Sequence, residues 1–365
     1  MPSIRVLVVD DSVVIRRLVT DSLEADPEIQ VVGAAANGRI ALSRLPQVNP
    51  DAVVLDIEMP EMDGLETLTA LRATHPRLPV VMFSTLTERG ATATLEALAR
   101  GASDYVTKPS NVGGVHEAME RIRAELIPKL KVLCGRPPVG PAAAERRAPV
   151  VAPVKNIQRR ATAGPAAPVE VVAIGVSTGG PVALERLFSA LPGDIGVPVV
   201  VVQHMPPVFT EMLARRLDGR SQLQVAEGAD GAVLRAGQAL IAPGDHHMVI
   251  SRAGAGVVVQ TTDGPPENSC RPAVDVLFRS VVDVYGPGVL GVVMTGMGQD
   301  GLRGSERIVE AGGRVLAQDR DTSVVWGMPG YVAEAGLADE VLPLDALAAA
   351  IARRTRRPVG ARSAP

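Results

Sequence analysis

Cysteine and aromatic residues are scarce in this chain. Its 365 residues include two cysteines, Cys134 and Cys270, and the aromatic residues are one Trp, three Tyr and four Phe. Two cysteines so far apart fit neither a disulfide framework nor a zinc site, and we interpret both as free thiols without a catalytic role. With so few aromatics, the hydrophobic cores have to be built from Val, Ala, Leu, Ile and Met.

Long apolar runs and a strong net charge are also missing. No stretch approaches the roughly 18 to 20 apolar residues that a membrane-spanning helix needs, and the start, MPSIRVLVVDD, lacks the cleavage pattern of a signal peptide. The formal net charge of −3 predicts no general attraction to nucleic acid or to an anionic membrane. The simplest interpretation is a cytoplasmic protein without membrane insertion or a nucleic-acid partner, long enough for two domains.

Two α/β domains joined by a linker are predicted from the pattern of the chain. Short β-rich runs alternate with helical patterns over residues 4–131, which predicts a parallel sheet with helices on both faces, and we place the first domain at residues 1–125. A stretch rich in proline and alanine predicts an interdomain linker at residues 126–167. A second doubly wound α/β domain is predicted at residues 168–352, in which QALIAP, HMVIS and GVVVQT look like strands of an antiparallel β-hairpin. We expect a disordered tail at residues 353–365.

Polar side chains follow the predicted strands of the first domain. They are Asp10, Asp11, Asp56, Ser84 and Lys108. In a doubly wound sheet these positions meet at the carboxyl ends of the strands, where ligands bind. Crowded carboxylates would repel one another unless a hard divalent cation such as Mg²⁺ lay among them, and a lysine and a serine hydroxyl suit a phosphoryl group. The pattern favours phosphoryl transfer to an aspartate, although Asp10 and Asp11 alone suit helix capping equally well.

Four motifs of the first domain form a specific set. They are D-D at 10–11, VVLDIEMP followed by a glycine at 64, VVMFST and GASDYVTKP. Together they resemble a response-regulator receiver domain over residues 1–125, which implies a flavodoxin-like fold and a histidine kinase as phosphodonor. By this resemblance Asp56 is the phosphoacceptor, Mg²⁺ is held by Asp10, Asp11, Asp56 and the backbone carbonyl of Glu58, and Ser84 and Lys108 contact the phosphoryl group. The resemblance also implies an aromatic switch at Tyr105 and a cis peptide bond at Lys108–Pro109.

The second domain places a serine, a histidine and an aspartate after apolar runs. Ser177 follows VVAIGV, His204 follows VPVVVVQ and Asp300 follows VLGVVMTGMGQ. A nucleophile, a base and an orienting carboxylate are the parts of covalent acyl chemistry, and G-V-S-T-G at 175–179 fits a nucleophile elbow between a strand and a helix. The alternative for V-S-T-G-G-P alone is a phosphate or dinucleotide cradle.

The partners of Ser177 have structural alternatives when each is taken alone. A histidine after a strand is more often structural than catalytic, and Asp300 in G-M-G-Q-D-G suits a turn or a helix cap. His246 and His247 compete with His204 as the base, but their place before HMVIS suits the rim of a hairpin better. The order serine, histidine, aspartate argues against an ordinary α/β-hydrolase, in which the acid precedes the histidine.

The motifs GVSTGGP, VVVVQHMP, GVVMTGMGQDG and GGRVLAQD occur together in the second domain. They resemble the catalytic domain of the chemotaxis protein-glutamate methylesterases/protein-glutamine glutaminases, the CheB family, over residues 168–352. The resemblance implies a hydrolase that demethylates glutamates of methyl-accepting chemoreceptors, deamidates certain glutamines and uses no cofactor for the esterase reaction. It assigns Ser177 as nucleophile, His204 as general base and later acid, and Asp300 as the carboxylate that orients His204.

Further residues and a mode of regulation follow from the same resemblance. The backbone N–H groups of Thr178 and Met297 are candidate oxyanion donors, and Arg271 and Asp275 in C-R-P-A-V-D either shape the substrate groove or form an ion pair at its edge. The unphosphorylated receiver is expected to block the serine until phosphorylation. The competing hypothesis is a response regulator whose output domain is a non-catalytic binding module; the absence of a helix-turn-helix signal and of a basic stripe argues against DNA binding.

Overall fold

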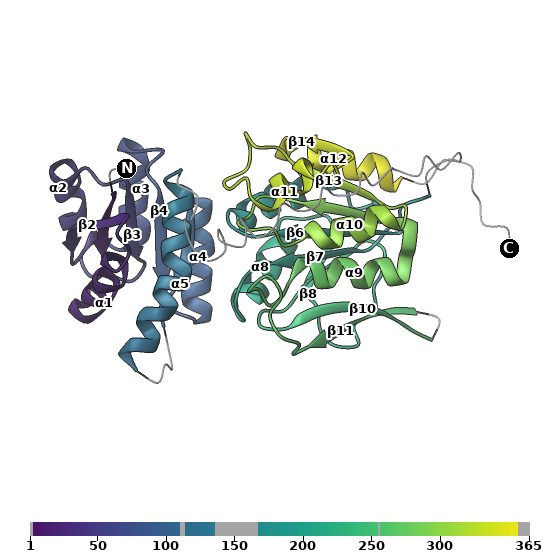
Figure 1. The fold of residues 1–365 in the computed structure, drawn as a ribbon, viewed down its shortest axis with the longest axis horizontal. Helices are drawn as coiled ribbons and strands as arrows, with labels where there is room; N and C mark the ends of the chain where they lie inside the picture. The colour runs from purple at the N-terminus through teal and green to yellow at the C-terminus, as the bar shows by residue number, and fades with distance from the viewer. Residues whose placement is uncertain (1–2, 110–113, 136–166, 255, 357–365) are drawn as a thin grey trace. The chain divides into compact units, whose positions relative to one another are not determined.

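The structure is a computed structural model that describes residues 3–109, 114–135, 167–254 and 256–356. The chain divides into two compact units, Met1–Ala148 and Pro149–Pro365, and each is described by itself (Figure 1). Most of the predicted linker lies outside the described residues. Within the described ranges, no helix is long and apolar enough to cross a membrane.

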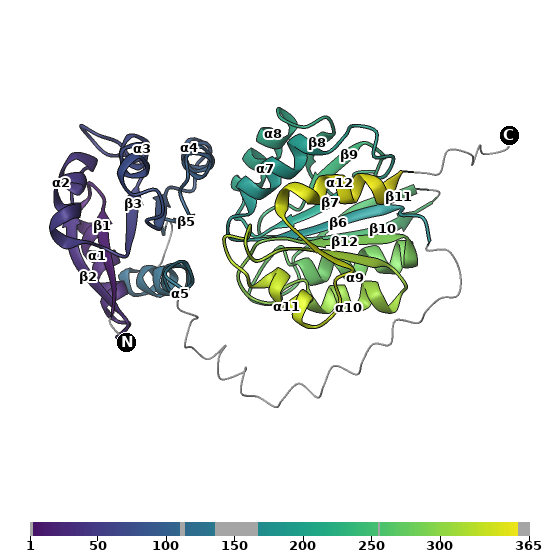
Figure 2. The same ribbon diagram turned by 90° about the horizontal axis from the view of Figure 1, so that it is seen from above.

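The first unit is built on a five-stranded parallel sheet in the order β2-β1-β3-β4-β5. Its strands are β1 (Ile4–Val9), β2 (Ile29–Ala35), β3 (Ala52–Asp56), β4 (Val80–Ser84) and β5 (Asp104–Thr107). Its helices are α1 (Val13–Glu24), α2 (Gly38–Val48), α3 (Gly64–Thr74), α4 (Glu88–Ala99) and α5 (Val115–Leu133). Helices α1 and α5 pack together on one face, and α2, α3 and α4 follow one another on the other (Figure 2). This is the flavodoxin-like arrangement predicted for the receiver.

Local capping sets the helix starts of this unit. Ser12 caps α1 through its side chain, and Asp63 and Glu66 form a reciprocal capping box at the start of α3. The N-cap of α1 is thus Ser12 and neither Asp10 nor Asp11. The capping alternative for these two aspartates is therefore wrong.

Helix α5 continues past the predicted end of the first domain. Ile122, Leu126 and Leu130 are buried in the core of this unit, and the helix ends only at Leu133. The boundary predicted at residue 125 falls inside α5, because the apolar positions continue at helical spacing. The Pro/Ala-rich texture begins after this helix, and residues 136–166 lie outside the described ranges.

The second unit is built on a seven-stranded parallel sheet in the order β14-β13-β12-β6-β7-β9-β8. Its strands are β6 (Val171–Val176), β7 (Val199–Gln203), β8 (Gln224–Glu227), β9 (Gln238–Ile241), β12 (Val289–Val293), β13 (Arg314–Gln318) and β14 (Glu340–Leu342). Its helices are α7 (Gly180–Ala190), α8 (Phe209–Asp218), α9 (Val274–Tyr285), α10 (Leu302–Glu310), α11 (Met328–Glu334) and α12 (Leu344–Thr355), with a short 3₁₀ helix at Gly286–Gly288. Helices α7, α8 and α12 cover one face, and α9, α10 and α11 cover the other (Figure 2).

A separate antiparallel hairpin packs beside this sheet. Its strands are β10 (His247–Ala253) and β11 (Gly256–Thr262), so HMVIS and GVVVQT form the predicted hairpin, which lies against α9. The run QALIAP does not belong to it: β9 joins the main sheet between β7 and β8, because Ala239, Leu240 and Ile241 are all buried and need cover on both faces. At the other end, α12 includes the first three residues of the predicted tail, and residues 357–365 lie outside the described ranges.

The strand order reverses between β6 and β12 in the middle of the larger sheet. Strand β6 leads through α7 to β7 on one side, while β12 is followed by β13 on the other. The carboxyl ends of strands at such a switch point open a crevice for ligands. Ser177 follows β6, His204 follows β7 and Asp300 lies in the loop after β12, so all three belong to the same edge of the sheet.

Candidate functional site

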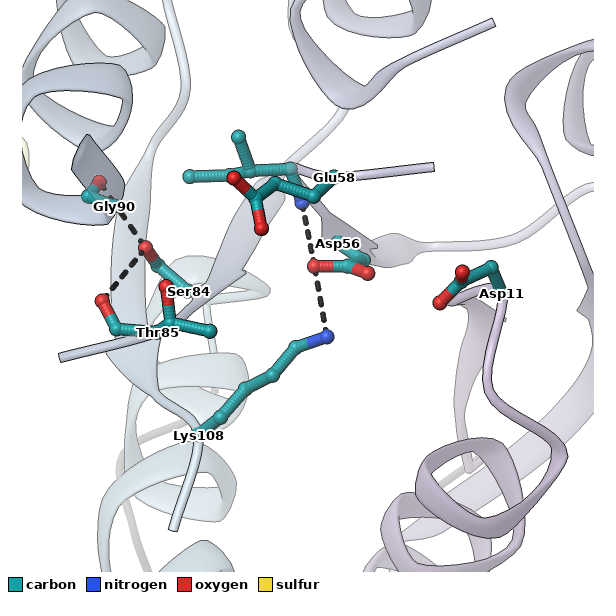
Figure 3. Close-up of a pocket in the computed structure, with 8 residues that line it drawn as sticks. Asp11, Asp56, Glu58, Ser84, Thr85, Gly90 and Lys108 are labelled. Atoms are coloured by element: carbon teal, nitrogen blue, oxygen red, sulfur yellow. Dashed lines mark hydrogen bonds and ion pairs between the residues drawn. The ribbon is translucent and has the colours of Figure 1, made fainter. Parts of the chain in front are cut away.

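The first unit has an acidic pocket at the carboxyl ends of its strands (Figure 3). It is lined by Asp11, Asp56, Ile57, Glu58, Ser84, Thr85, Gly90 and Lys108. Lys108 Nζ lies 2.8 Å from Asp10 Oδ2 and 2.9 Å from Asp56 Oδ1, and both carboxylates are buried. One ammonium group thus faces two buried carboxylates, so the pocket carries excess negative charge.

The donor set of this pocket fits a hard divalent cation. Carboxylate oxygens of Asp10, Asp11 and Asp56 all lie within 4.8 Å of one another, and Asp56 Oδ2 is buried without a hydrogen-bond partner. Burial raises the pKa of Asp56 to about 6, with the Asp10 charge acting in the same direction and Lys108 opposing it. A divalent cation that prefers oxygen ligands would bind Asp56 Oδ2 and reduce the repulsion among the three carboxylates.

The other predicted receiver residues lie in or near the pocket. Ser84 Oγ is 3.2 Å from the carbonyl oxygen of Gly90, and a Cβ on Gly90 would stand 2.4 Å from the Thr85 carbonyl oxygen, so a glycine is required there. Tyr105 is buried, with Lys129 Nζ over its ring. The expected cis peptide is not at Lys108–Pro109: within the described ranges, the cis bond is Arg271–Pro272. Sequence reasoning missed Thr85, although it is the last residue of the VVMFST motif, and Gly90 in the first turn of α4.

The second unit forms a tight elbow around Ser177. Gly179 adopts a left-handed φ of 78°, and the Gly180 N–H donates to the Ser177 carbonyl oxygen at 2.8 Å. A Cβ on Gly180 would lie 1.8 Å from Gln203 Oε1, while Gln203 Nε2 donates to that same Ser177 carbonyl at 3.0 Å. Two glycines are therefore required to fold the strand sharply into α7, as expected of a nucleophile elbow.

His204 and Asp300 form a hydrogen-bonded pair in which Asp300 is buried and His204 is partly buried. His204 Nε2 lies 2.8 Å from Asp300 Oδ2, and Asp300 also accepts from the backbone N–H groups of Val274, Asp275 and Gly301 at 2.7, 3.0 and 3.0 Å. Burial opposes ionisation of Asp300, but the contact with His204 and the backbone donors outweigh it and lower the pKa of this carboxyl. Asp300 is thus an ionised carboxylate fixed toward the imidazole.

The second nitrogen of His204 faces a cysteine. Cys270 Sγ lies 3.5 Å from His204 Nδ1, a contact that no pattern in the chain predicted. Burial acts to lower the pKa of His204, but the charge of Cys270 and the bonds to Asp300 and Cys270 outweigh it and raise the pKa to about 10. In the described part of the chain, no hydrogen bond joins Ser177 Oγ to His204. The imidazole is therefore held between Asp300 and Cys270, and the backbone N–H of His204 donates to the carbonyl oxygen of Val176, the residue before Ser177.

Thr295 ties the loop after β12 to the elbow. Its carbonyl oxygen accepts from the Ser177 N–H at 3.0 Å, and its hydroxyl donates to the Thr178 carbonyl oxygen at 2.9 Å. In the same loop, the Met297 N–H donates to no acceptor among the described residues. Gly296, the residue before Met297, lies against the serine, since a Cβ there would stand 2.8 Å from Ser177 Cβ; the Met297 N–H stays a predicted oxyanion donor.

The remaining candidates of the second unit have structural partners. His247 is buried; its Nε2 bonds the Pro265 carbonyl oxygen at 3.1 Å and its Nδ1 accepts from the Ala273 N–H. His246 pairs with Asp263 on the exposed rim. Both ring nitrogens of His247 are occupied, and neither histidine lies on the elbow.

Among the described residues, Arg271 and Asp275 do not pair with each other, although an ion pair at the groove edge was one of their two interpretations. Arg271 pairs with Asp245 at 2.6 Å, whereas Asp275 is buried and accepts from the Gly304 N–H and from Asn268. Sequence reasoning missed Asn268, and also Gln203 and Thr295. The last two are polar residues at the ends of apolar runs, the same signal that pointed to Ser177.

Comparisons with known proteins show the family to which the two units belong. The family model of the response regulator receiver domain matches residues 6–120, and that of the CheB methylesterase matches residues 172–351. The protein-glutamate methylesterase/protein-glutamine glutaminase of Trichodesmium erythraeum (strain IMS101) is 53% identical over 97% of this chain and 99% of its own length. The one of Nocardioides sp. (strain ATCC BAA-499 / JS614) is 56% identical over 98% and 97%.

A solved structure is similar to the second unit. The crystal structure of the Thermotoga maritima CheB methylesterase catalytic domain matches with a TM-score of 0.50 and 40% identity, covering 51% of this chain and 99% of that chain. The relatives match both units in the same order along almost the full chain. The chain therefore belongs to the protein-glutamate methylesterase/protein-glutamine glutaminase family, and it is a hydrolase of that family with an N-terminal response-regulator receiver domain.

Proposed function

We propose that this hydrolase removes methyl esters from glutamate side chains of methyl-accepting chemoreceptors, and deamidates glutamines there, by a Ser177–His204–Asp300 mechanism under the control of phosphorylation. The observation that carries the proposal is the pair of His204 with the buried Asp300, at 2.8 Å, beside the Ser177 elbow. An ionised, five-fold hydrogen-bonded carboxylate favours the imidazolium that forms when the base accepts a proton.

The geometry supports a role for the Nδ1 nitrogen of His204 in the reaction. Nε2 is bonded to Asp300, so Nδ1 has to exchange Cys270 for the hydroxyl of Ser177. Ser177 Oγ then attacks the side-chain carbonyl carbon and its proton passes to Nδ1. Developing charge on the carbonyl oxygen is accepted by the N–H of Met297 and, as predicted from the motif, by that of Thr178.

Collapse of the tetrahedral intermediate breaks the bond to the methoxy oxygen. Methanol leaves with the proton from His204 Nδ1, or ammonia leaves when the substrate is a glutamine. Water then gives a proton to the same nitrogen and attacks the acyl carbon, and Ser177 recovers its proton as the glutamate is released. No cofactor enters these steps.

The acidic pocket is proposed as the phosphorylation site, with Asp56 as the acceptor and a histidine kinase as the donor. Mg²⁺ would be held by Asp10, Asp11, Asp56 and the backbone carbonyl of Glu58, and when bound it neutralises the phosphoryl oxygens. Lys108 and Ser84 are placed on the same pocket and suit contacts to the phosphoryl group. Phosphorylation is proposed to relieve inhibition of the second unit by the first, in a cytoplasmic protein.

Methanol release from methylated chemoreceptor membranes tests this function. The full chain is compared with Ser177→Ala, each with and without a small-molecule phosphodonor and Mg²⁺; Ser189→Ala, an exposed serine at the far end of α7, is the matched control. We expect release that needs Ser177 but not Ser189 and that rises with the phosphodonor. Folded protein without release under any condition would favour a non-catalytic output domain.

A further inference from the structure

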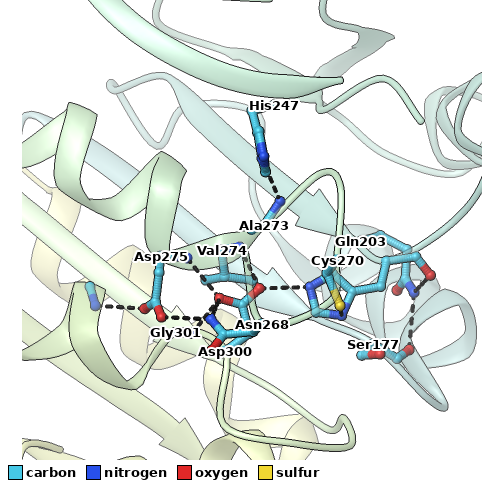
Figure 4. A network of polar contacts seen from close by, with 12 residues as sticks. Ser177, Gln203, His247, Asn268, Cys270, Ala273, Val274, Asp275, Asp300 and Gly301 are labelled. Atoms are coloured by element: carbon cyan, nitrogen blue, oxygen red, sulfur yellow. Dashed lines mark hydrogen bonds and ion pairs between the residues drawn. The ribbon is translucent and has the colours of Figure 1, made fainter. Parts of the chain in front are cut away.

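A second buried carboxylate stands behind the catalytic pair and has no role in the mechanism above. Asp275 lies in the first turn of α9 and is 1% exposed. Its Oδ1 accepts from the Gly304 N–H at 2.6 Å, and its Oδ2 accepts from Asn268 Nδ2 at 2.9 Å. The same Asn268 nitrogen donates to Asp300 Oδ1 at 2.9 Å. One amide group therefore bridges two carboxylates (Figure 4).

The bridge resolves an electrostatic conflict. Two buried carboxylates so close together repel each other, and the two hydrogens of one amide nitrogen allow each carboxylate to receive one bond. Burial, and then the charge of Asp300, raise the pKa of Asp275 to about 6, whereas the pKa of Asp300 is lowered. The two acids are therefore unequal, and Asp300, which bonds His204, remains the ionised one.

Asn268 lies in an exposed turn, residues 267–270, and its side chain extends from this turn to the two carboxylates. Backbone hydrogen bonds of 3.1 and 2.9 Å between Glu267 and Cys270 close the turn, and Asn268 has a left-handed φ of 52°, which asparagine tolerates better than most residues. Glu267 is tied to α9 by a two-bond pair with Arg279 at 2.7 and 2.6 Å. The same turn brings Cys270 to His204, so a single turn contacts both partners of the serine.

We propose that Asn268 and Asp275 are positioning residues of the esterase: Asn268 holds Asp300 Oδ1 so that Oδ2 faces His204, and Asp275, anchored on the Gly304 N–H, fixes the orientation of the Asn268 amide. The inference rests on the proposed function of the Ser177 site. It extends the constellation from three residues to five, with Gly304 at the start of α10 as its backbone anchor.

Two single substitutions test the two halves of the bridge. Asn268→Gly removes the amide and keeps the left-handed turn, and we expect kcat for methanol release to fall about 10- to 100-fold, as for loss of a hydrogen bond to a charged group. Ser269→Gly is the matched control, because Ser269 also has a left-handed φ and forms no side-chain hydrogen bond among the described residues. Asp275→Asn should also lower kcat, since its amide would face the amide of Asn268.

A charge swap separates positioning from simple structural damage. Asn268→Asp sets a third carboxylate between the other two and should be the least active variant. Adding Asp275→Asn to it supplies an amide that donates to residue 268 while its oxygen still accepts from Gly304, so we expect activity to recover about tenfold. The same substitution thus lowers kcat in one background and raises it in the other; loss of activity in both would overturn the proposal.

A measurement without substrate can fail independently of the proposed function. It therefore tests the roles of Asn268 and Asp275 separately from esterase activity. The imidazole of His204 is titrated by NMR in the full chain, with unfolding midpoints recorded for every variant. The charged groups near Asp275 are Asp300, Glu267, Arg279 and Arg303, and removing the Asp275 charge should lower the pKa of His204. An unchanged His204 titration in both folded single variants would refute the bridge, whereas absent methanol release by the wild type would count only against the proposed function.

Discussion

The buried charge of Asp56 is predicted to destabilise the first unit when no cation is present. At pH 8 we expect Asp56→Asn to be more stable than the wild-type chain in the presence of a chelator. The asparagine oxygen still accepts the Ile57 N–H that Asp56 Oδ1 accepts at 2.8 Å, and Lys108 keeps its contact with Asp10. The substitution therefore removes mainly the charge.

The size of the effect follows from the pKa of Asp56. A rise from 3.8 to about 6 corresponds to about 3 kcal/mol at about 1.4 kcal/mol per unit. Solvent that enters the pocket reduces this to about 1 to 2 kcal/mol, which is about 4 to 8 °C in Tm for a unit of this size. Because the folded-state pKa is raised, the destabilisation is absent below pH 3.8, grows up to about pH 6 and is constant above.

Differential scanning calorimetry of the full chain measures this difference. The transition of the first unit is identified as the one that excess Mg²⁺ shifts in the wild type, and that shift should shrink in Asp56→Asn. Asp21→Asn on the exposed surface of α1 is the control, with an expected change within about 0.5 kcal/mol. A Tm for Asp56→Asn at or below that of the wild type at pH 8, or an equal gain at pH 4, would refute the reasoning.

Two further predictions concern the second unit. Cys270→Ser should move the acidic midpoint of kcat/KM to lower pH. The reaction needs the base form of His204, and the Cys270 charge raises the pKa of His204. A midpoint that does not move would argue against a role for this contact. Gly180→Ala should lower kcat more than tenfold. The new Cβ would lie 1.8 Å from Gln203 Oε1 and would displace the Gln203 side chain, which donates to the Ser177 carbonyl oxygen. Steady-state kinetics measure kcat and a urea titration measures stability; an unchanged kcat would contradict the prediction.

Much of both sites was predictable because their residues stand at the ends of buried strands. Parallel strands of a doubly wound sheet end on the same side, so a polar residue at the end of a predicted strand is already placed at a ligand-binding edge, as for Asp56, Lys108, Ser177 and His204. The elbow was predictable as well, since its glycines follow from a turn with no room for a Cβ. These inferences need only local pattern and the direction of the strands.

Other features depended on segments far apart in the chain. The run QALIAP, which contains β9, was predicted to be a hairpin strand. Its pairing with β7 and β8 shows that it belongs to the main sheet. An ion pair at the groove edge was the alternative interpretation of Arg271 and Asp275, but Asp275 points inward to Asn268 and Gly304. Strand pairing and side-chain direction are set by packing between distant elements, which composition and spacing do not contain.

The sequence by itself determined the two α/β units, their order and the strand ends that carry the chemistry, because apolar runs long enough to be buried leave few other arrangements. Only the tertiary structure decided which nitrogen of His204 meets Asp300, that Cys270 lies on the other, and that Asn268 links Asp300 to Asp275. Those contacts arise where α9, the turn before it and the loop after β12 meet, and a hydrogen bond requires its donor and acceptor at about 3 Å.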